Sequence, residues 1–205
     1  MVKVKVCGIR RLADALAAID LGADFLGFNF WPGTPRRIEP AKAKNIIAKV
    51  RGRAKIVGVF VNQSLAEVNA IVDALGLDYA QLHGEEPPDF CAAVHAPVIK
   101  ALRLGSAKDM AACKGYRKVI WLVDSKTKKF GGSGLSPDWK LAKKAGAKLG
   151  KILLAGGLNA ENVGDAIQMV GPWAVDVASG VEKSPGVKDR AKLNKFFEAV
   201  KNASR

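Results

Sequence analysis

Eight short β-rich runs alternate with longer segments of helical periodicity along the whole chain. The runs are residues 2–7, 24–30, 55–61, 79–83, 97–102, 118–124, 151–157 and 173–179. Between them, apolar residues recur at the spacing of one helix face, as Leu65, Val68 and Val72 do. A strand followed by a helix, repeated eight times, predicts a parallel sheet covered by helices.

Neither a linker nor a shift in composition divides residues 1–205. We therefore expect a single α/β domain, an eight-stranded parallel (βα)8 TIM barrel near the short limit for that fold. An open doubly wound sheet is the alternative, because eight strand–helix units alone do not prove that the sheet closes. Ser64, Ser136 with Pro137, and Asn159 are expected to precede the third, sixth and seventh helices.

Positive charge dominates the composition. The chain has 33 Lys and Arg against 19 Asp and Glu, a formal net charge of +14. Such a balance favours nucleic acid, an acidic membrane, or a small phosphorylated or carboxylated substrate. We expect this chain to bind neither nucleic acid nor a membrane. Aromatic residues make up only 7% of the chain and are not interleaved with a basic stripe. No apolar run approaches the roughly 18 residues of a transmembrane helix, and MVKVKVCGI alternates instead of forming a signal peptide's apolar block.

Cysteine and histidine are scarce and scattered. Cys7, Cys91 and Cys113 are too few for a disulfide framework, which favours a reducing cytoplasm. The chain has no CxxC or HExxH spacing, and His83 and His95 lie far apart, so we expect no metal site.

Polar residues stand where several predicted strands end. Side chains along a barrel strand alternate between the interior and the surrounding helices. This alternation points Cys7, His83, Asp124 and Asp176 inward, from four different strands and near one rim. Because the chemistry of parallel barrels collects at the strand ends, these four side chains are candidates for a site.

Glycine pairs follow the last two predicted strands. Gly156 and Gly157 come after the seventh run, and Ser179 and Gly180 after the eighth. Glycine lets backbone N–H groups approach phosphate oxygens closely, and these two loops are the usual phosphate site of barrels. The alternative is that they only form tight strand-to-helix turns. Their coincidence in both loops favours phosphate binding.

Two further loops carry candidate functional residues. The segment 31–40 holds Arg36 and Arg37 behind two prolines and a glycine, a stiff setting that suits bidentate recognition of a carboxylate. For one of these two arginines we expect simple exposure to solvent. The glycine-rich segment 131–134 is neither a Walker loop nor a dinucleotide fingerprint. It is interpreted as a lid, with a plain flexible connection as the alternative.

Taken together, these motifs resemble the phosphoribosylanthranilate isomerase family of tryptophan biosynthesis, a family of single-domain barrel enzymes. The resemblance covers residues 4–197. It depends on the segments KVCGI (5–9), GADFLGFNF (22–30), TPRRI (34–38), VGVFVN (57–62), QLHGEE (81–86), VDSK (123–126), GGSG with DW (131–139), AGGLNAENV (155–163) and VDVASGVE (175–182).

The resemblance implies an Amadori rearrangement without a cofactor, because electrons move only within the substrate. In this interpretation Asp124 is the general acid that opens the ribose ring, and Cys7 is the general base that removes the C2′ proton. Asp124 must then hold a proton near neutral pH, which its apolar strand favours. Cys7 must be partly thiolate, which the inward-facing Lys5 favours.

The resemblance also assigns groups that bind the substrate. Arg36 would hold the anthranilate carboxylate, and His83 and Asp176 would lie close to the substrate. For His83 a hydrogen-bonded structural role is the alternative, and Asp176 could instead orient a lysine or backbone groups. The proposed phosphate-binding residues are Gly156, Gly157, Ser179 and Gly180.

Other functions are less well supported by the sequence. A dual-specificity barrel isomerase that also acts on the histidine-pathway aminoaldose would need two phosphate sites and a carboxylate base after the first strand, where Cys7 stands. A basic nucleic-acid-binding protein is suggested only by the charge. The sequence does not indicate an oligomeric state.

Overall fold

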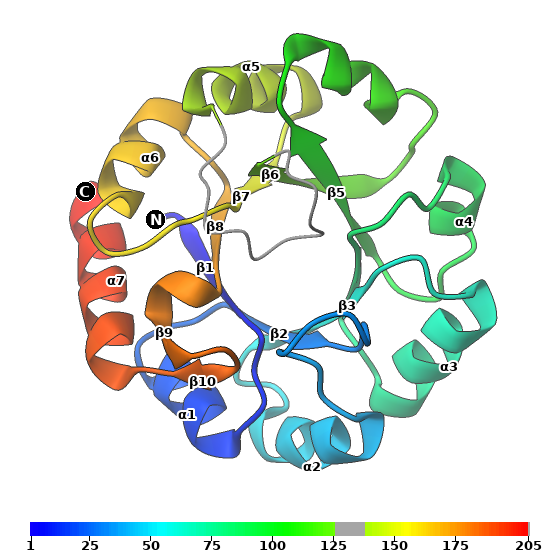
Figure 1. Ribbon diagram of the computed structural model, residues 1–205, viewed down its shortest axis with the longest axis vertical. Coiled ribbons are helices and arrows are strands. Elements are labelled where there is room, and N and C mark those ends of the chain that lie inside the picture. The colour runs from blue at the N-terminus through cyan, green and yellow to red at the C-terminus, as the bar shows by residue number, and fades with distance from the viewer. Residues whose placement is uncertain (126–137, 205) are drawn as a thin grey trace.

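Eight parallel strands close into a barrel in chain order, and β8 pairs back onto β1 (Figure 1). The computed structural model describes residues 1–125 and 138–204, so the predicted lid at 131–134 lies outside the described residues. The strands are β1 (Lys3–Cys7), β2 (Phe25–Asn29), β3 (Lys55–Phe60), β4 (Tyr79–Leu82), β5 (Val98–Leu104), β6 (Val119–Ser125), β7 (Ile152–Leu154) and β8 (Ala174–Val177). Closure confirms the predicted barrel and excludes the open doubly wound sheet.

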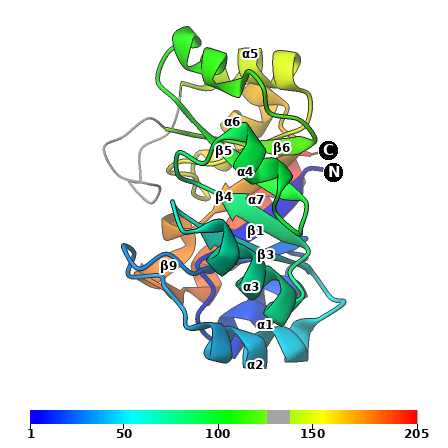
Figure 2. The ribbon, with the colours of Figure 1, turned by 90° about the vertical axis from the view of Figure 1, so that its right-hand side faces the viewer.

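Among the described residues, eight helices surround the barrel, one after each strand. They are α1 (Leu12–Asp20), α2 (Pro40–Val50), α3 (Leu65–Leu75), α4 (Pro88–Ala92), the 3₁₀ helix η1 (Ala107–Cys113), α5 (Trp139–Leu149), α6 (Val163–Val170) and α7 (Arg190–Ala203). Between β8 and α7 the chain adds a short helix η2 (Ser179–Val181) and a two-stranded sheet of β9 (Glu182–Ser184) and β10 (Val187–Lys188). Figure 2 shows both termini on one side of the barrel and the β9 segment on the other.

Two of the predicted helix starts can be compared with the structure. Ser64 caps α3, and its hydroxyl oxygen accepts from the N–H of Glu67. The start predicted at Asn159 is wrong by three residues, because Asn159 Oδ1 accepts from the N–H groups of Glu161 and Asn162 in a separate turn. Helix α6 begins only after Asn162.

A third start is only partly described. Helix α5 begins after Asp138, whose carboxylate accepts from the N–H groups of Lys140 and Leu141. Ser136 and Pro137 lie outside the described residues.

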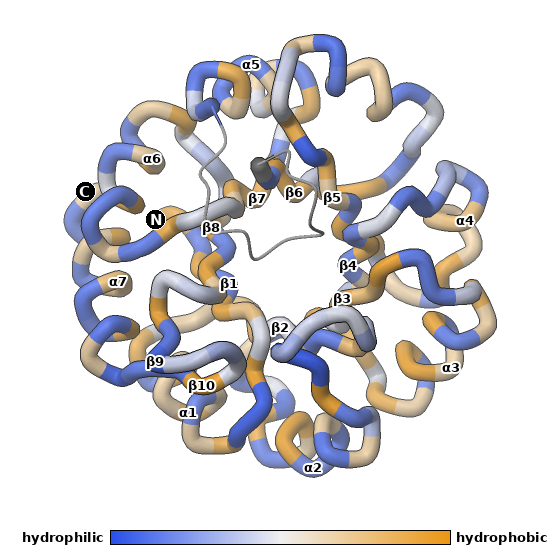
Figure 3. Tube along the Cα trace, viewed as in Figure 1, coloured by the Kyte–Doolittle hydropathy of each residue, from blue (hydrophilic) through white to orange (hydrophobic). Residues whose placement is uncertain are grey.

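The apolar core has two layers, as the strand alternation predicts. One layer lies between the barrel and its helices and includes Val4, Val6 and Val123. The other fills the barrel interior and contains Phe25, Val57, Ile99, Leu122, Leu153, Ala155 and Ala174. Hydrophobic residues accordingly gather along the strands in Figure 3, and hydrophilic ones are spread over the surrounding helices and loops. Within residues 1–125 and 138–204, no helix combines the length and the apolar character needed to span a membrane.

Leu122 provides a test of the interior layer, because it has no exposed surface there. The Leu122→Ala variant is expected to lower the free energy of unfolding by about 2–5 kcal/mol, through lost burial and a residual cavity. Equilibrium urea denaturation measures this loss. The volume-conserving Leu122→Met variant is the control and should cost less than about 1.5 kcal/mol. Equal losses in both variants would contradict a close-packed interior.

Candidate active site

A cavity opens at the carboxyl ends of the strands. It is lined by Cys7, Asn29, Thr34, Arg36, Val59, Val61, Gln81, His83, Asp124, Ala155, Gly156, Gly157, Leu158, Asp176, Ala178 and Ser179. Eight of the nine site residues predicted from the sequence are in this set. The exception, Gly180, packs against the Leu158 carbonyl oxygen. Asn29, Thr34 and Gln81 also line the cavity and were not predicted. Asn29 ends β2 and Gln81 lies one residue before the end of β4, so a polar side chain near a strand end is a signal that could have found both, whereas Thr34 stands in a loop without such a signal.

Cys7 ends β1 beside a buried ion pair. Lys5 Nζ lies 2.9 Å from Asp176 Oδ1 on β8, and the Lys5 side chain is 0% exposed. A Cβ atom added to Gly27 on β2 would lie 2.8 Å from Cys7 Sγ and 3.2 Å from Lys5 Nζ. The thiol and the ammonium group therefore share the space that the missing side chain of Gly27 leaves open.

The ionisation of Cys7 reflects opposing effects. Burial raises the pKa of the Cys7 thiol, Lys5 acts to lower it, and the outcome is a pKa above the ordinary value. Burial acts to lower the pKa of Lys5, but Asp176 and Cys7 together outweigh burial and raise it. As predicted, Lys5 acts to stabilise the thiolate, because it lowers the pKa of Cys7. Burial raises this pKa by more than Lys5 lowers it. In the structure described, the thiol form is therefore favoured.

Asp124 and His83 face each other from β6 and the end of β4. His83 Nε2 lies 3.3 Å from Asp124 Oδ2, and both side chains are largely buried. His83 Nδ1 lies 3.0 Å from Nε2 of Gln81 on the same strand. If this amide nitrogen donates to Nδ1, the neutral imidazole carries its proton on Nε2, towards Asp124. The contact between His83 and Asp124 lacks hydrogen-bond geometry, so His83 Nε2 is a buried polar atom beside the carboxyl group with no hydrogen-bond partner among the described residues.

Arg36 and Arg37 have different environments, as the sequence led us to expect. The Arg36 guanidinium is largely buried and contacts Glu182, with Nε–Oε1 and Nη2–Oε2 distances of 3.0 and 2.7 Å. Arg37 is exposed, and its Nη2 lies 3.1 Å from the exposed Glu39 carboxylate. Only Arg36 therefore lines the cavity.

The glycine-rich loops after β7 and β8 are packed against each other. Gly156 and Gly157 have φ angles of 90° and 58°, which glycine adopts most readily. A Cβ atom on Gly180 would lie 1.9 Å from the Leu158 carbonyl oxygen. Glycine is thus needed at 180 for the loop contact itself, while Gly156, Gly157 and Ser179 form the cavity wall.

A metal site is not found in the part of the chain that the structure describes. Among residues 1–125 and 138–204, no group of three or more His, Cys, Asp or Glu side chains is placed to hold a metal ion. The cavity instead offers a thiol, a carboxyl group, an imidazole and a guanidinium.

A closed parallel barrel with ionisable groups at its strand ends and glycine-rich loops after β7 and β8 defines a (βα)8-barrel enzyme site. The family model of N-(5′-phosphoribosyl)anthranilate (PRA) isomerase matches residues 4–199. The chain belongs to this family, which confirms the resemblance seen in the sequence.

Individual relatives cover nearly the whole chain. N-(5′-phosphoribosyl)anthranilate isomerase of Pelobacter propionicus is 46% identical over 202 residues, which are 98% of this chain and 96% of that protein. The crystal structure of phosphoribosyl anthranilate isomerase from Thermotoga maritima has a TM-score of 0.93 and 41% identity, covering 98% of this chain and 100% of that one. A second crystal structure of phosphoribosyl anthranilate isomerase contains reduced 1-(o-carboxyphenylamino)-1-deoxyribulose 5-phosphate. It has a TM-score of 0.89 and 38% identity, and the match covers 98% of this chain and 100% of that one.

Lys5→Met tests the electrostatic description of Cys7. Removing the ammonium group leaves Asp176, which raises the pKa of Cys7, opposed only by the smaller effect of Lys188, so this pKa should rise further. The rate of alkylation at fixed pH, in a protein whose Cys91 and Cys113 are replaced by Ala, should fall about tenfold for each unit of the rise. Lys151→Met, at an exposed lysine, is the control and should leave the rate unchanged. Faster alkylation of the Lys5→Met protein would contradict the assignment.

Proposed function

We propose that the chain converts N-(5′-phosphoribosyl)anthranilate to 1-(2-carboxyphenylamino)-1-deoxyribulose 5-phosphate, an Amadori rearrangement in tryptophan biosynthesis. The observation that carries the proposal is that Cys7 and Asp124 line one cavity from β1 and β6, strands that β7 and β8 separate. A base and an acid so arranged can act on two different atoms of one substrate. Membership of the isomerase family supports the same reaction.

The reaction divides into two proton transfers. Asp124 donates a proton to the ribose ring oxygen, and the ring opens as the nitrogen lone pair forms an iminium ion. Cys7 thiolate then removes the C2′ proton, which gives an enolamine that tautomerises to the ketone. Atoms and electrons balance within the substrate, so no external oxidant or reductant takes part.

Lys5 and His83 support these transfers in the proposal. The Lys5 ammonium lies beside Cys7 and stabilises the thiolate that burial alone disfavours. His83, whose Nε2 lies 3.3 Å from Asp124 Oδ2 without hydrogen-bond geometry, is assigned to contact the substrate beside the acid. Asp176 keeps Lys5 charged in the barrel interior.

The two anionic ends of the substrate require separate binding groups. Arg36 is assigned to the anthranilate carboxylate, and the phosphate is assigned to the loops that contain Gly156, Gly157, Ser179 and Gly180. Glycine in these loops permits close approach of backbone N–H groups to phosphate oxygens. The net charge of +14 favours the approach of such a substrate. The scarcity of cysteine supports a cytoplasmic location.

Cys7→Ala and Asp124→Asn are each expected to reduce kcat by about 10²–10⁴-fold, the usual contribution of a general acid or base. Turnover is followed by the loss of anthranilate fluorescence from freshly generated substrate. Cys113→Ala and Asp165→Asn, which change residues outside the cavity, are the matched controls and should retain activity. Near-normal turnover in Cys7→Ala or Asp124→Asn would overturn that residue's role. Absence of turnover in the unmodified protein would reject the proposed substrate, and the histidine-pathway aminoaldose would be tested next.

Arg36→Ala is expected to raise KM by about 10–100-fold with a smaller change in kcat, because the lost contact holds the substrate in both ground and transition states. Arg37→Ala is the matched control, since the Arg37 side chain is exposed and pairs with the exposed carboxylate of Glu39. Steady-state kinetics with the same substrate measure both constants. A large loss of kcat at unchanged KM would contradict a binding role for Arg36.

A further inference from the structure

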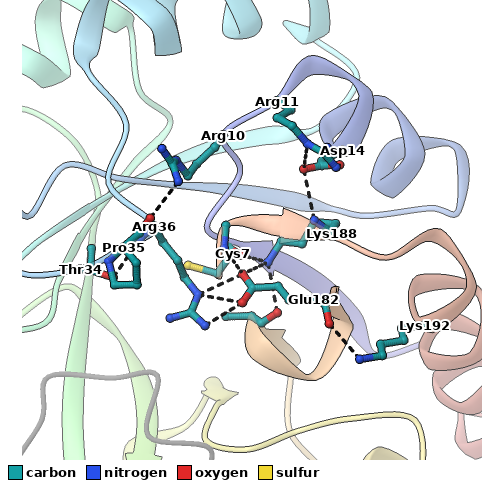
Figure 4. Close-up of polar contacts among 12 residues, drawn as sticks. Cys7, Arg10, Arg11, Asp14, Thr34, Pro35, Arg36, Glu182, Lys188 and Lys192 are labelled. Carbon is teal, nitrogen blue, oxygen red and sulfur yellow. Dashed lines mark hydrogen bonds and ion pairs between the residues drawn. The ribbon is translucent and has the colours of Figure 1, made fainter. Parts of the chain in front are cut away.

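Two buried charges outside the proposed acid–base set, Glu182 and Lys188, lie beside Arg36 and Cys7 (Figure 4). Glu182 begins β9 and Lys188 ends β10. Their side chains are 4% and 1% exposed, and Lys188 Nζ lies 2.9 Å from Glu182 Oε1. Burying an ion pair costs desolvation free energy that the attraction often only offsets. We therefore explain the position of the Glu182–Lys188 pair by the groups that it holds in place, and not by its own contribution to stability.

Glu182 holds one edge of Arg36. Arg36 Nε and Nη2 both donate to the Glu182 carboxylate, at 3.0 and 2.7 Å. A guanidinium group can bind a carboxylate through this Nε/Nη2 edge or through its Nη1/Nη2 edge. With the first edge bound to Glu182, the second can receive another planar carboxylate.

Lys188 holds the ends of two strands. Its ammonium group donates to the Cys7 carbonyl oxygen, to the Ala178 carbonyl oxygen at 3.1 Å, and to Glu182 Oε1 at 2.9 Å. An ammonium group has three N–H donors, and these contacts use all of them. One buried side chain thus links the end of β1, the loop after β8 and the carboxylate that holds Arg36.

Packing at Gly8 completes this arrangement. Gly8 has a φ angle of 80°, and a Cβ atom there would lie 2.8 Å from Arg36 Cδ. The aliphatic part of Arg36 therefore lies directly against the peptide that follows Cys7. Gly186, also at positive φ, donates its N–H to Glu182 Oε1 at 3.2 Å and so fixes the carboxylate from the hairpin side.

The charges of the cluster support binding of one more anion. Burial acts to raise the pKa of Glu182, but Arg36 and Lys188 outweigh it and keep the pKa below its ordinary value. Glu182 is therefore ionised near neutral pH. Burial lowers the pKa of Lys188 from its ordinary value, although Glu182 opposes this. When Lys188 holds its proton, it carries a net charge of +1 together with Arg36 and Glu182, which a substrate carboxylate neutralises.

We propose that Glu182 and Lys188 are positioning residues of the isomerase. Glu182 orients Arg36 towards the carboxylate of the substrate, and Lys188 fixes the backbone that carries Cys7. This inference rests on the roles proposed above for Arg36 and Cys7. It predicts separate kinetic effects for the two residues, because one acts on binding and the other on the base.

The first experiment compares KM and kcat in two variants. Glu182→Gln removes the charge that orients Arg36 and should raise KM about tenfold, with kcat changed less than about threefold. Lys188→Met releases the Cys7 carbonyl and should lower kcat about 10–100-fold, the cost of slightly misplacing a catalytic group. Glu198→Gln and Lys195→Met, at exposed positions of α7, are the matched controls. Equal losses of kcat in Glu182→Gln and Lys188→Met, or normal kinetics in both, would overturn the inference.

The second experiment tests whether Glu182 acts through Arg36. The double variant Glu182→Gln/Arg36→Ala should have the KM of Arg36→Ala, because nothing remains for Glu182 to orient. Binding of reduced 1-(o-carboxyphenylamino)-1-deoxyribulose 5-phosphate should weaken about tenfold in Glu182→Gln. Binding of the same compound without its carboxylate should not change. Additive losses in KM, or equal weakening for both compounds, would show a merely structural role.

Folding is checked by circular dichroism and thermal unfolding. If a single variant does not fold, Glu182→Gln/Lys188→Met removes both buried charges together and leaves none of the pair uncompensated. This double variant should show both a raised KM and a lowered kcat. Wild-type kinetics in it would overturn the inference. Failure of the proposed function is distinguishable, because the unmodified protein would then show no turnover.

Discussion

The buried contact between Lys5 and Asp176 determines much of the chemistry in this barrel. It joins β1 to β8, where the first and last strands of the barrel meet. It places the positive charge of Lys5, whose side chain has no exposed surface, beside Cys7. Without the carboxylate, burial would act on Lys5 with less opposition, and without Lys5, the thiol would lose the cation that most lowers its pKa. The ionisation of Cys7 thus depends on an ion pair between β1 and β8, the first and last strands of the barrel.

The inward residues could be predicted because their positions follow from regular geometry. Alternation along each strand is enough to place Cys7, His83, Asp124 and Asp176 on the interior side, and parallel strands bring their ends to one rim. The same alternation assigns Val123 to the helix-facing layer, where the structure has it. The particular reaction could not be read from this pattern. It came from the resemblance of ordered motifs to one enzyme family.

The residues that sequence reasoning missed depend on contacts between distant segments. Glu182 is 146 residues from Arg36 along the chain, and no local periodicity indicates that they meet. Lys188 stands in a two-residue strand, too short to show an alternation. Asn159 was misplaced as a helix cap because a turn and a helix start use the same side-chain chemistry. Local patterns predict elements and faces, whereas such pairings require the folded chain.

Gly27 limits which side chains this barrel can accept beside Cys7. The space there exists because a neighbouring strand carries no side chain at that point. A Cβ atom at 27 would lie 2.8 Å from the Cys7 sulfur atom and 3.2 Å from the Lys5 ammonium, so a side chain at 27 requires one of them to move. A group larger than the thiol at position 7 would need still more of the same space. Anyone who redesigns Cys7 therefore has to treat residues 5, 7 and 27 as one design problem.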